Sequence, residues 1–151
     1  MAEIGARTTL EELVDAALAR IERLEPAEAL AAMDDGALLV YIRSREARER
    51  DGVVPGSLHL PRTVLEWRVD PDSPWQNPHV GGLERRIVLL CDHGYSSILA
   101  AATLVDLGFA RTGDVVGGFS AWRAAGLPFV DATDPLLAAG VLAGMKPPDG
   151  D

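Results

Sequence analysis

Short apolar segments alternate with more polar stretches along this chain, and the alternation predicts its elements. Four segments are typical of strands, at residues 37–42, 57–60, 87–90 and 114–116. The run Ile-Val-Leu-Leu at 87–90 is continuous, as in a strand that is covered on both faces. Because helical patterns lie between these strands, the sequence predicts an α/β domain with an open, mainly parallel sheet flanked by helices.

The N-terminal region is predicted to be helical. Thr9 and Glu12 fit a capping box. An apolar stripe at helical spacing follows the box and consists of Leu10, Leu13, Val14, Ala17, Ile21 and Leu24. We expect this helix to pack on the domain, with a dimer-forming helix as the alternative. A second, short helix should begin at Pro26 and stop before Gly36.

The segment 86–107 predicts a strand, a tight loop and a helix, and it contains the only cysteine, Cys91. In open α/β sheets, ligands bind at the carboxyl ends of the strands, where Cys91 lies. The backbone N–H groups of such a loop and the N-terminus of the helix suit an anion. A cysteine at this position should have a lowered pKa and act as a nucleophile. The alternative is a buried cysteine that acts as a small hydrophobic residue.

Small residues in the same loop support the turn. Gly94 gives the backbone conformational freedom. The hydroxyl of Ser96 or Ser97 can cap the helix that follows. That helix is marked by apolar residues at helical spacing and ends near Gly108. The last strand should lead through Gly117 into another short helix.

Composition narrows the class of protein. The chain has 151 residues, 48% of them apolar and 25% charged, which fits one globular domain with a full core. Its net charge of −9 argues against a nucleic-acid-binding surface. No apolar run approaches the roughly 18 residues of a membrane span, and the N-terminus lacks the order of a signal peptide. A single cysteine cannot form an internal disulfide, which is compatible with a cytoplasmic protein.

Two further segments are less regular. Residues 62–82 form a long loop with Trp67 and Trp75. Such a loop can wall a pocket, but we favour tryptophans that simply bury surface. Arg62 and Arg68 in this loop could bring positive charge to the Cys91 loop, although ordinary solvated arginines are an equal alternative. We expect residues 131–151 to be a tail, in which 136–142 forms a helical turn or two.

Three blocks, in order, resemble the rhodanese-like domain family over residues 28–130. The first is L-L-V-Y-I-R-S and the second is G-V-V-P-G-S-L-H-L-P. The third is I-V-L-L-C-D-H-G-Y-S-S, with V-V-G-G-F-S-A-W-R-A-A-G-L-P after it. The resemblance implies an open, mainly parallel five-stranded sheet, here with an extra N-terminal helix. We therefore expect a helical extension at 1–25, a rhodanese-like domain at 26–130 and the tail at 131–151.

The resemblance also implies a sulfurtransferase without a cofactor. Cys91 would attack a sulfane-sulfur donor, become a persulfide and pass the outer sulfur to a thiol or to cyanide. The substrate would be held by the loop residues Asp92, His93, Gly94, Tyr95, Ser96 and Ser97. The expected partners are a small-molecule or protein sulfur donor and a thiol acceptor. A monomer and a homodimer are both compatible with the sequence.

The chain departs from the family pattern at several positions. Tyr41 stands where the first strand usually has aspartate, and Val53 stands where the turn usually has histidine, while Arg43 is kept. In the loop, Asp92 and Ser96 replace two arginines. We expect the Asp92 carboxylate to raise the pKa of the thiol and to repel an anionic donor, so that thiosulfate is a poor donor.

Other functions remain as alternatives. Some cysteine phosphatases share this fold, but they close a longer loop with an arginine, whereas this loop ends in Ser96 and Ser97. A non-catalytic binding or regulatory module is the second alternative. His93 is expected to face solvent or substrate rather than to act as a base. No metal site is expected, because His59 and His79 have no partner at ligand spacing.

Overall fold

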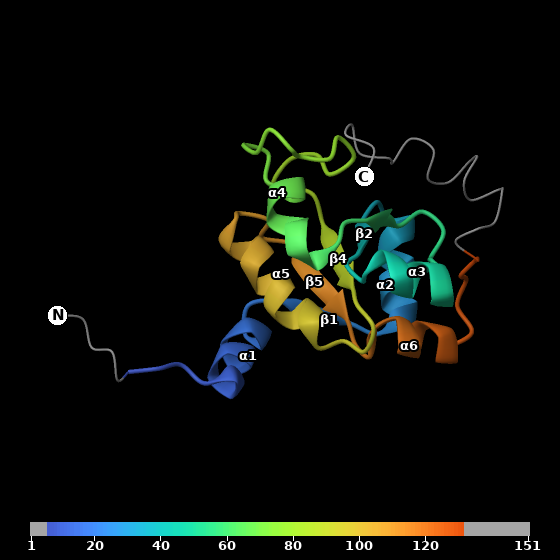
Figure 1. Ribbon diagram of the computed structural model, residues 1–151, viewed down its shortest axis with the longest axis horizontal. Helices are drawn as coiled ribbons and strands as arrows, with labels where there is room; N and C mark the ends of the chain where they lie inside the picture. The colour runs from blue at the N-terminus through green and yellow to red at the C-terminus, as the bar shows by residue number, and fades with distance from the viewer. Residues whose placement is uncertain (1–5, 132–151) are drawn as a thin grey trace.

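Within residues 6–131, which the computed structural model describes, five strands form one sheet in the order β1-β5-β4-β2-β3 (Figure 1). The strands are β1 Glu22–Leu24, β2 Leu38–Tyr41, β3 Leu58–His59, β4 Ile87–Leu90 and β5 Thr112–Val115. All neighbouring pairs are parallel. The predicted open, mainly parallel five-stranded α/β fold is therefore confirmed.

Helices cover both faces of the sheet. They are α1 Leu10–Leu18, α2 Pro26–Asp34, α3 Arg45–Asp51, the 3-10 turn η1 Arg62–Val64, α4 Leu65–Val69, α5 Ser96–Asp106 and α6 Gly118–Ala124. Figure 1 shows α4 and α5 on one side of the sheet and α2 and α6 on the other. The predicted helix after Pro26 and the short helix after Gly117 are both present.

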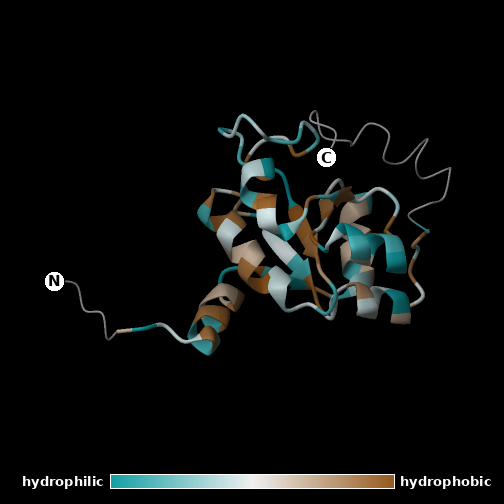
Figure 2. Cartoon of the chain, viewed as in Figure 1, coloured by the Kyte–Doolittle hydropathy of each residue, from teal (hydrophilic) through white to brown (hydrophobic). Residues whose placement is uncertain are grey.

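The side chains of β4 alternate between two hydrophobic clusters, one on each face of the sheet. Ile87 and Leu89 belong to the cluster under α5, and Val88 and Leu90 belong to the cluster under α2 and α6. All four residues of the strand are fully buried. Figure 2 shows this apolar centre between the more polar outer helices. Because successive side chains of a strand point to opposite faces, a continuous apolar run is what a strand covered on both sides requires.

The N-terminal helix is shorter than predicted. Its capping box between Thr9 and Glu12 is present, but the helix ends at Leu18. Residues Glu22–Leu24 instead form an edge strand beside β5. Ile21 and Leu24 pack against opposite faces of the sheet, which suits a strand and not one helical stripe. The α1 helix packs on α5, as we expected.

The segment 62–82 is also more ordered than predicted, because it contains η1 and α4. Trp67 and Trp75 are 59% and 56% exposed, so the interpretation that they bury surface is wrong. Leu65 and Val69 fill the core in their place. The predicted helical turn at 136–142 lies outside the described residues. None of the helices in the described part of the chain is both long and apolar enough to span a membrane.

Candidate active site

The loop between β4 and α5 packs tightly against the start of α6. Gly94 has φ +82°, and a Cβ there would lie 2.6 Å from the backbone nitrogen of Gly117. The N–H groups of Phe119 and Ser120 donate to the carbonyl oxygens of Cys91 and Asp92 at 2.8 and 3.0 Å. A glycine is therefore required at position 94 for two reasons. The backbone has a positive φ, and the close approach of Gly117 leaves no room for a Cβ.

Cys91 sits at the bottom of this loop and is 5% exposed. The N–H of Gly94 donates to its sulfur at 3.2 Å, and the thiol donates to the Ser97 Oγ at 3.3 Å. Burial raises the pKa of Cys91, but hydrogen bonds from the Ser97 and Ser96 hydroxyls and from backbone N–H groups outweigh it. The net pKa lies below the ordinary value of a thiol, so the predicted direction for a reactive cysteine is confirmed.

Ser97 links Cys91 to a buried ion pair that the sequence did not suggest. Its hydroxyl donates to Oδ2 of Asp114 at 2.7 Å, and Asp114 is 0% exposed. Arg23 on β1 donates to both carboxylate oxygens of Asp114, at 2.9 and 3.0 Å. The same guanidinium donates to the carbonyl oxygen of Gly94 at 2.8 Å. The edge strand β1 thus contacts the cysteine loop through the side chain of Arg23.

This arrangement corrects the prediction that a serine caps α5. The N-cap position is Tyr95, which makes no side-chain capping bond. The Ser97 hydroxyl is engaged by Asp114 and Cys91 instead. The one available sequence signal for this network was an aspartate, Asp114, within an otherwise buried strand. A buried carboxylate needs a charged or hydrogen-bonding partner, which here is Arg23.

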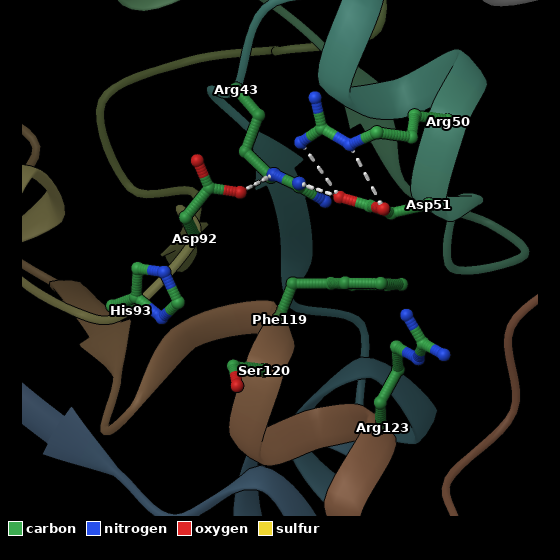
Figure 3. A pocket seen from close by; sticks show the side chains of 8 residues that line it. All are labelled: Arg43, Arg50, Asp51, Asp92, His93, Phe119, Ser120 and Arg123. Carbon is green, nitrogen blue, oxygen red and sulfur yellow. Dashed lines mark hydrogen bonds and ion pairs between the residues drawn. The ribbon is translucent and has the colours of Figure 1, made fainter.

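Asp92 is held in an ion pair at the side of the loop. Its carboxylate forms an ion pair with Arg43, which also pairs with Asp51 (Figure 3). The Arg43 side chain is only 3% exposed, and its guanidinium carbon lies 5.1 Å from the centre of the Phe119 ring. The pKa of Cys91 is lowered on balance by the hydrogen bonds around its sulfur, and the predicted contribution of Asp92 to that pKa stays a prediction.

Tyr41 and Val53, the two departures from the family pattern outside the loop, have structural roles. The hydroxyl of Tyr41 donates to the carbonyl oxygen of Gly52 at 3.1 Å and accepts a hydrogen bond from Arg43. Burial raises the pKa of Tyr41 to about 12. Val53 is buried and forms an isolated antiparallel bridge with Val130. Tyr41 therefore braces Arg43, and Val53 ties its turn to the segment around Val130.

Two adjoining hollows open beside the loop. The first, of about 220 Å³, is lined by Ile42, Arg43, Cys91, Asp92, His93, Tyr95 and Ser96. The second, of about 300 Å³, is lined by Arg43, Arg50, Asp51, Asp92, His93, Phe119, Ser120 and Arg123 (Figure 3). The hollows share Arg43, Asp92 and His93, so a molecule that reaches Cys91 can extend into the second hollow.

Four of the predicted loop residues line the first hollow together with Cys91. Of these, His93 is exposed, and Tyr95 is 77% exposed at the rim. Gly94 and Ser97 are buried and act through their hydrogen bonds to the sulfur. Arg62 and Arg68 line neither hollow; Arg62 pairs with Glu66, and Arg68 is buried. Arg43 supplies the positive charge that we had sought on the long loop.

In the part of the chain that the structure describes, no three His, Cys, Asp or Glu side chains cluster as metal ligands would. The Nε2 atom of His59 lies 2.8 Å from the carbonyl oxygen of Arg43. His59 therefore contacts the backbone of the segment that carries Arg43.

The fold and this loop define a class of protein, namely a small parallel α/β domain with a low-pKa thiol at the carboxyl end of a central strand. A family model described as the rhodanese-like domain matches residues 25–125. The chain belongs to the rhodanese-like domain family.

Named relatives and a solved structure agree with this assignment. A thiosulfate sulfurtransferase GlpE of Pseudomonas syringae is 34% identical over 107 residues, which are 70% of this chain and 91% of that protein. A GlpE protein of Stutzerimonas stutzeri is 34% identical over 68% of this chain and 84% of its own length. A Rhodopseudomonas palustris protein of unknown function, described as a possible tyrosine phosphatase, has TM-score 0.74 and 36% identity. That match covers 86% of this chain and 99% of the other.

Proposed function

We propose that this protein is a sulfurtransferase that carries sulfane sulfur as a persulfide on Cys91. The observation that carries the proposal is the sulfur of Cys91 itself, which is held by the Gly94 N–H and Ser97 and lines a hollow together with Arg43. Its lowered pKa increases the thiolate fraction near neutral pH. The names of the relatives support the reaction class.

The proposed reaction has two transfers that balance in atoms and electrons. The Cys91 thiolate attacks the outer sulfur of thiosulfate, a new S–S bond forms, and the S–S bond of the donor breaks with release of sulfite. The enzyme then holds a persulfide whose inner sulfur is Cys91 Sγ. Cyanide or an acceptor thiolate attacks the outer sulfur next, and the Cys91 thiolate leaves. The products are thiocyanate or an acceptor persulfide.

Thiosulfate belongs among the proposed donors. Our expectation of a poor thiosulfate enzyme depended on a free Asp92 carboxylate, but Arg43 neutralises that carboxylate in an ion pair. Arg43 also faces the hollow of Cys91, where it can attract a sulfonate group. A low-molecular-weight or protein persulfide remains a second donor class, because the first hollow is open and its rim is formed by an exposed tyrosine.

The acceptor is proposed to enter through the second hollow. Phe119 lies buried beneath this hollow, and Arg50 and Arg123 lie on its far side from His93 (Figure 3). A small thiol or a protein cysteine that enters here can reach the persulfide through the lining that the two hollows share, at Arg43, Asp92 and His93. We propose that the chain works in the cytoplasm, where a reduced thiol persists, as a monomer or a homodimer.

The test is the steady-state formation of thiocyanate from thiosulfate and cyanide. The wild type should form thiocyanate, and Cys91→Ser should form none. The unfolding temperature of Cys91→Ser should equal that of the wild type, which shows that the variant is folded. A folded, reduced wild type that makes no thiocyanate, and whose thiol alkylates no faster than a free thiol, would support the binding module instead.

A cysteine phosphatase is the competing enzyme class, because the Rhodopseudomonas structure carries that description. Phosphate transfer on a cysteine loop needs an arginine that clamps the phosphate oxygens. Here the loop ends in Ser96 and Ser97, and the arginine that lines the hollow of Cys91, Arg43, is held by two carboxylates. We expect no Cys91-dependent hydrolysis of an aryl phosphate, and detectable hydrolysis would replace the sulfurtransferase proposal.

A further inference from the structure

The buried carboxylate of Asp114 takes no part in the two transfers, yet it lies one hydroxyl away from the reacting sulfur. It is 0% exposed and accepts hydrogen bonds from Ser97 at 2.7 Å and from Arg23 at 2.9 and 3.0 Å. Burial of a charge is costly unless the charge is paired and hydrogen-bonded. A neutral residue would fill a strand position at lower cost, so the placement of this ion pair calls for an explanation.

The Ser97 hydroxyl has a single proton, and two groups compete for it. When Cys91 is a thiol, its S–H donates to Oγ of Ser97, and Ser97 donates to Asp114. When Cys91 is a thiolate, the sulfur has no proton and can only accept a hydrogen bond. Ser97 must then turn its proton from Asp114 toward the sulfur, and Asp114 keeps the two bonds from Arg23.

We propose that Asp114 and Arg23 are positioning residues that control the proton of Ser97, so that Ser97 serves the Cys91 thiol and its thiolate with different hydrogen bonds. Asp114 favours the thiol because it competes for the proton. Arg23 favours the thiolate, since it weakens that competition and carries a positive charge beneath the loop. The two residues act through Ser97 and through the loop carbonyl of Gly94, not on the substrate.

Electrostatic coupling between Arg23 and the sulfur agrees with this assignment. Hydrogen bonding to Asp114 is the main cause that raises the pKa of Arg23, and the charge of Cys91 adds to the rise. Four other charged or titratable residues line the hollow of Cys91, namely Arg43, Asp92, His93 and Tyr95, and the charge of Glu25 acts on Arg23. Those groups stay unchanged in the variants below, so any shift comes from the Arg23 side.

The experiment is a titration of Cys91 by its alkylation rate with iodoacetamide, across neutral and alkaline pH and without any donor. Ser97→Ala should raise the midpoint, since the thiolate loses a donor. Arg23→Gln should also raise it, because a positive charge is lost. Asp114→Asn should lower it, because a negative charge is lost and Ser97 is freed. Each shift should be roughly one pH unit.

The proposal predicts that Asp114→Asn and Ser97→Ala shift the alkylation midpoint in opposite directions, which a purely structural role would not do. If Asp114→Asn raises the midpoint as Ser97→Ala does, or if the midpoint does not move, the proposal is wrong. Asp106→Asn is the matched control, since it removes a carboxylate that pairs with Arg20 away from the loop, and it should leave the midpoint unchanged.

A second comparison keeps the proposal testable if Asp114→Asn does not fold. The Arg23 side chain is 29% exposed, and the amide of a glutamine in its place can still donate a hydrogen bond to Asp114, so Arg23→Gln is the second variant, with its folding checked by thermal unfolding. Arg23→Gln should shift the alkylation midpoint less in a Ser97→Ala background than in the wild type, because part of the effect of Arg23 passes through the Ser97 hydroxyl. An equal shift in both backgrounds would overturn the role of Ser97. The proposal rests on Cys91 as the reactive thiol, but the titration needs no sulfur transfer, so its failure would leave the proposed function standing.

Discussion

Gly94 determines the geometry of the cysteine loop at the scale of single residues. Its φ is +82°, its N–H donates to the sulfur, and the backbone of Gly117 occupies the place where a Cβ would lie. The sequence predicted a flexible glycine after Cys91 because a tight strand-to-helix turn commonly needs one. It could not predict the contact with Gly117, which comes from the next β-strand connection.

Gly94→Ala should therefore abolish most of the sulfurtransferase activity. The new Cβ would lie 2.6 Å from the Gly117 nitrogen, so the loop must move and the bond to the sulfur is lost. The control is Gly36→Ala, which has φ +98° but no atom within 4 Å of the new Cβ. Both variants carry the strain of a positive φ, of about 1–2 kcal/mol. Equal activity in the two variants, measured as thiocyanate formation, would contradict this account of the loop.

Asp92 gives a second prediction at this scale, on donor preference. Asp92→Asn should raise kcat/KM for thiosulfate by roughly 3- to 10-fold, because a negative charge beside Cys91 is lost and Arg43 keeps only one carboxylate partner, Asp51. The rate with a neutral persulfide donor should change little. Steady-state kinetics with both donors measure the ratio, and Asp106→Asn is the matched control. A loss of thiosulfate activity would show that the carboxylate assists the reaction.

Arg23 and Asp114, which support the cysteine loop, could not be predicted from the sequence. Cys91 and its neighbours are contiguous, so a strand, a glycine and a helix pattern were enough to find them. Arg23 and Asp114 are 91 positions apart and meet only because β1 pairs with β5. That pairing depends on the packing of the whole sheet, which no local pattern contains.

Among the elements, the strongly apolar ones were predicted and the weakly patterned ones were not. The strand β4 and the helix α5 were found with nearly correct bounds, because both are buried on most sides. The edge strand β1 has three residues, of which one is buried, so its pattern is too short to separate from the helix before it. The short helix α4 was hidden in a region rich in proline.

Two tryptophans on opposite sides of the sheet differ in burial, so their removal should affect the stability of the fold differently. Trp122 on α6 is fully buried and its indole N–H donates to the carbonyl oxygen of Pro128 at 2.8 Å. Trp122→Ala should lower the free energy of unfolding by about 3–5 kcal/mol. Trp67→Ala, at a residue that is 59% exposed, should change it by no more than about 0.5 kcal/mol. Urea unfolding of both variants measures the difference, and similar losses would contradict the burial of Trp122.

At the scale of the whole molecule, the ionisation of Cys91 should make the free energy of unfolding depend on pH. Burial raises the pKa of Cys91 and hydrogen bonds lower it more, so the folded thiol ionises at a lower pH than the unfolded one. The unfolded chain then binds more protons between the two pKa values, and stability rises with pH there. The contribution is complete above the ordinary thiol pKa of about 8.5 and is lost as the pH falls through the folded pKa.

This sign can be checked by urea unfolding of the reduced wild type and of Cys91→Ala across the neutral and mildly alkaline range. The difference in unfolding free energy between wild type and variant should move in favour of the wild type as the pH rises. A difference that is constant, or that moves the other way, would show that the fold does not stabilise the thiolate.

The central claim of this account is that Cys91 carries sulfur during turnover. The most direct test is the intact mass of the reduced protein after exposure to thiosulfate, with Cys91→Ser treated in parallel. The account predicts that the wild type gains the mass of one sulfur atom, that cyanide removes it with the formation of thiocyanate, and that Cys91→Ser gains nothing. A folded and reduced wild type that gains no sulfur from thiosulfate or from a persulfide donor would contradict it.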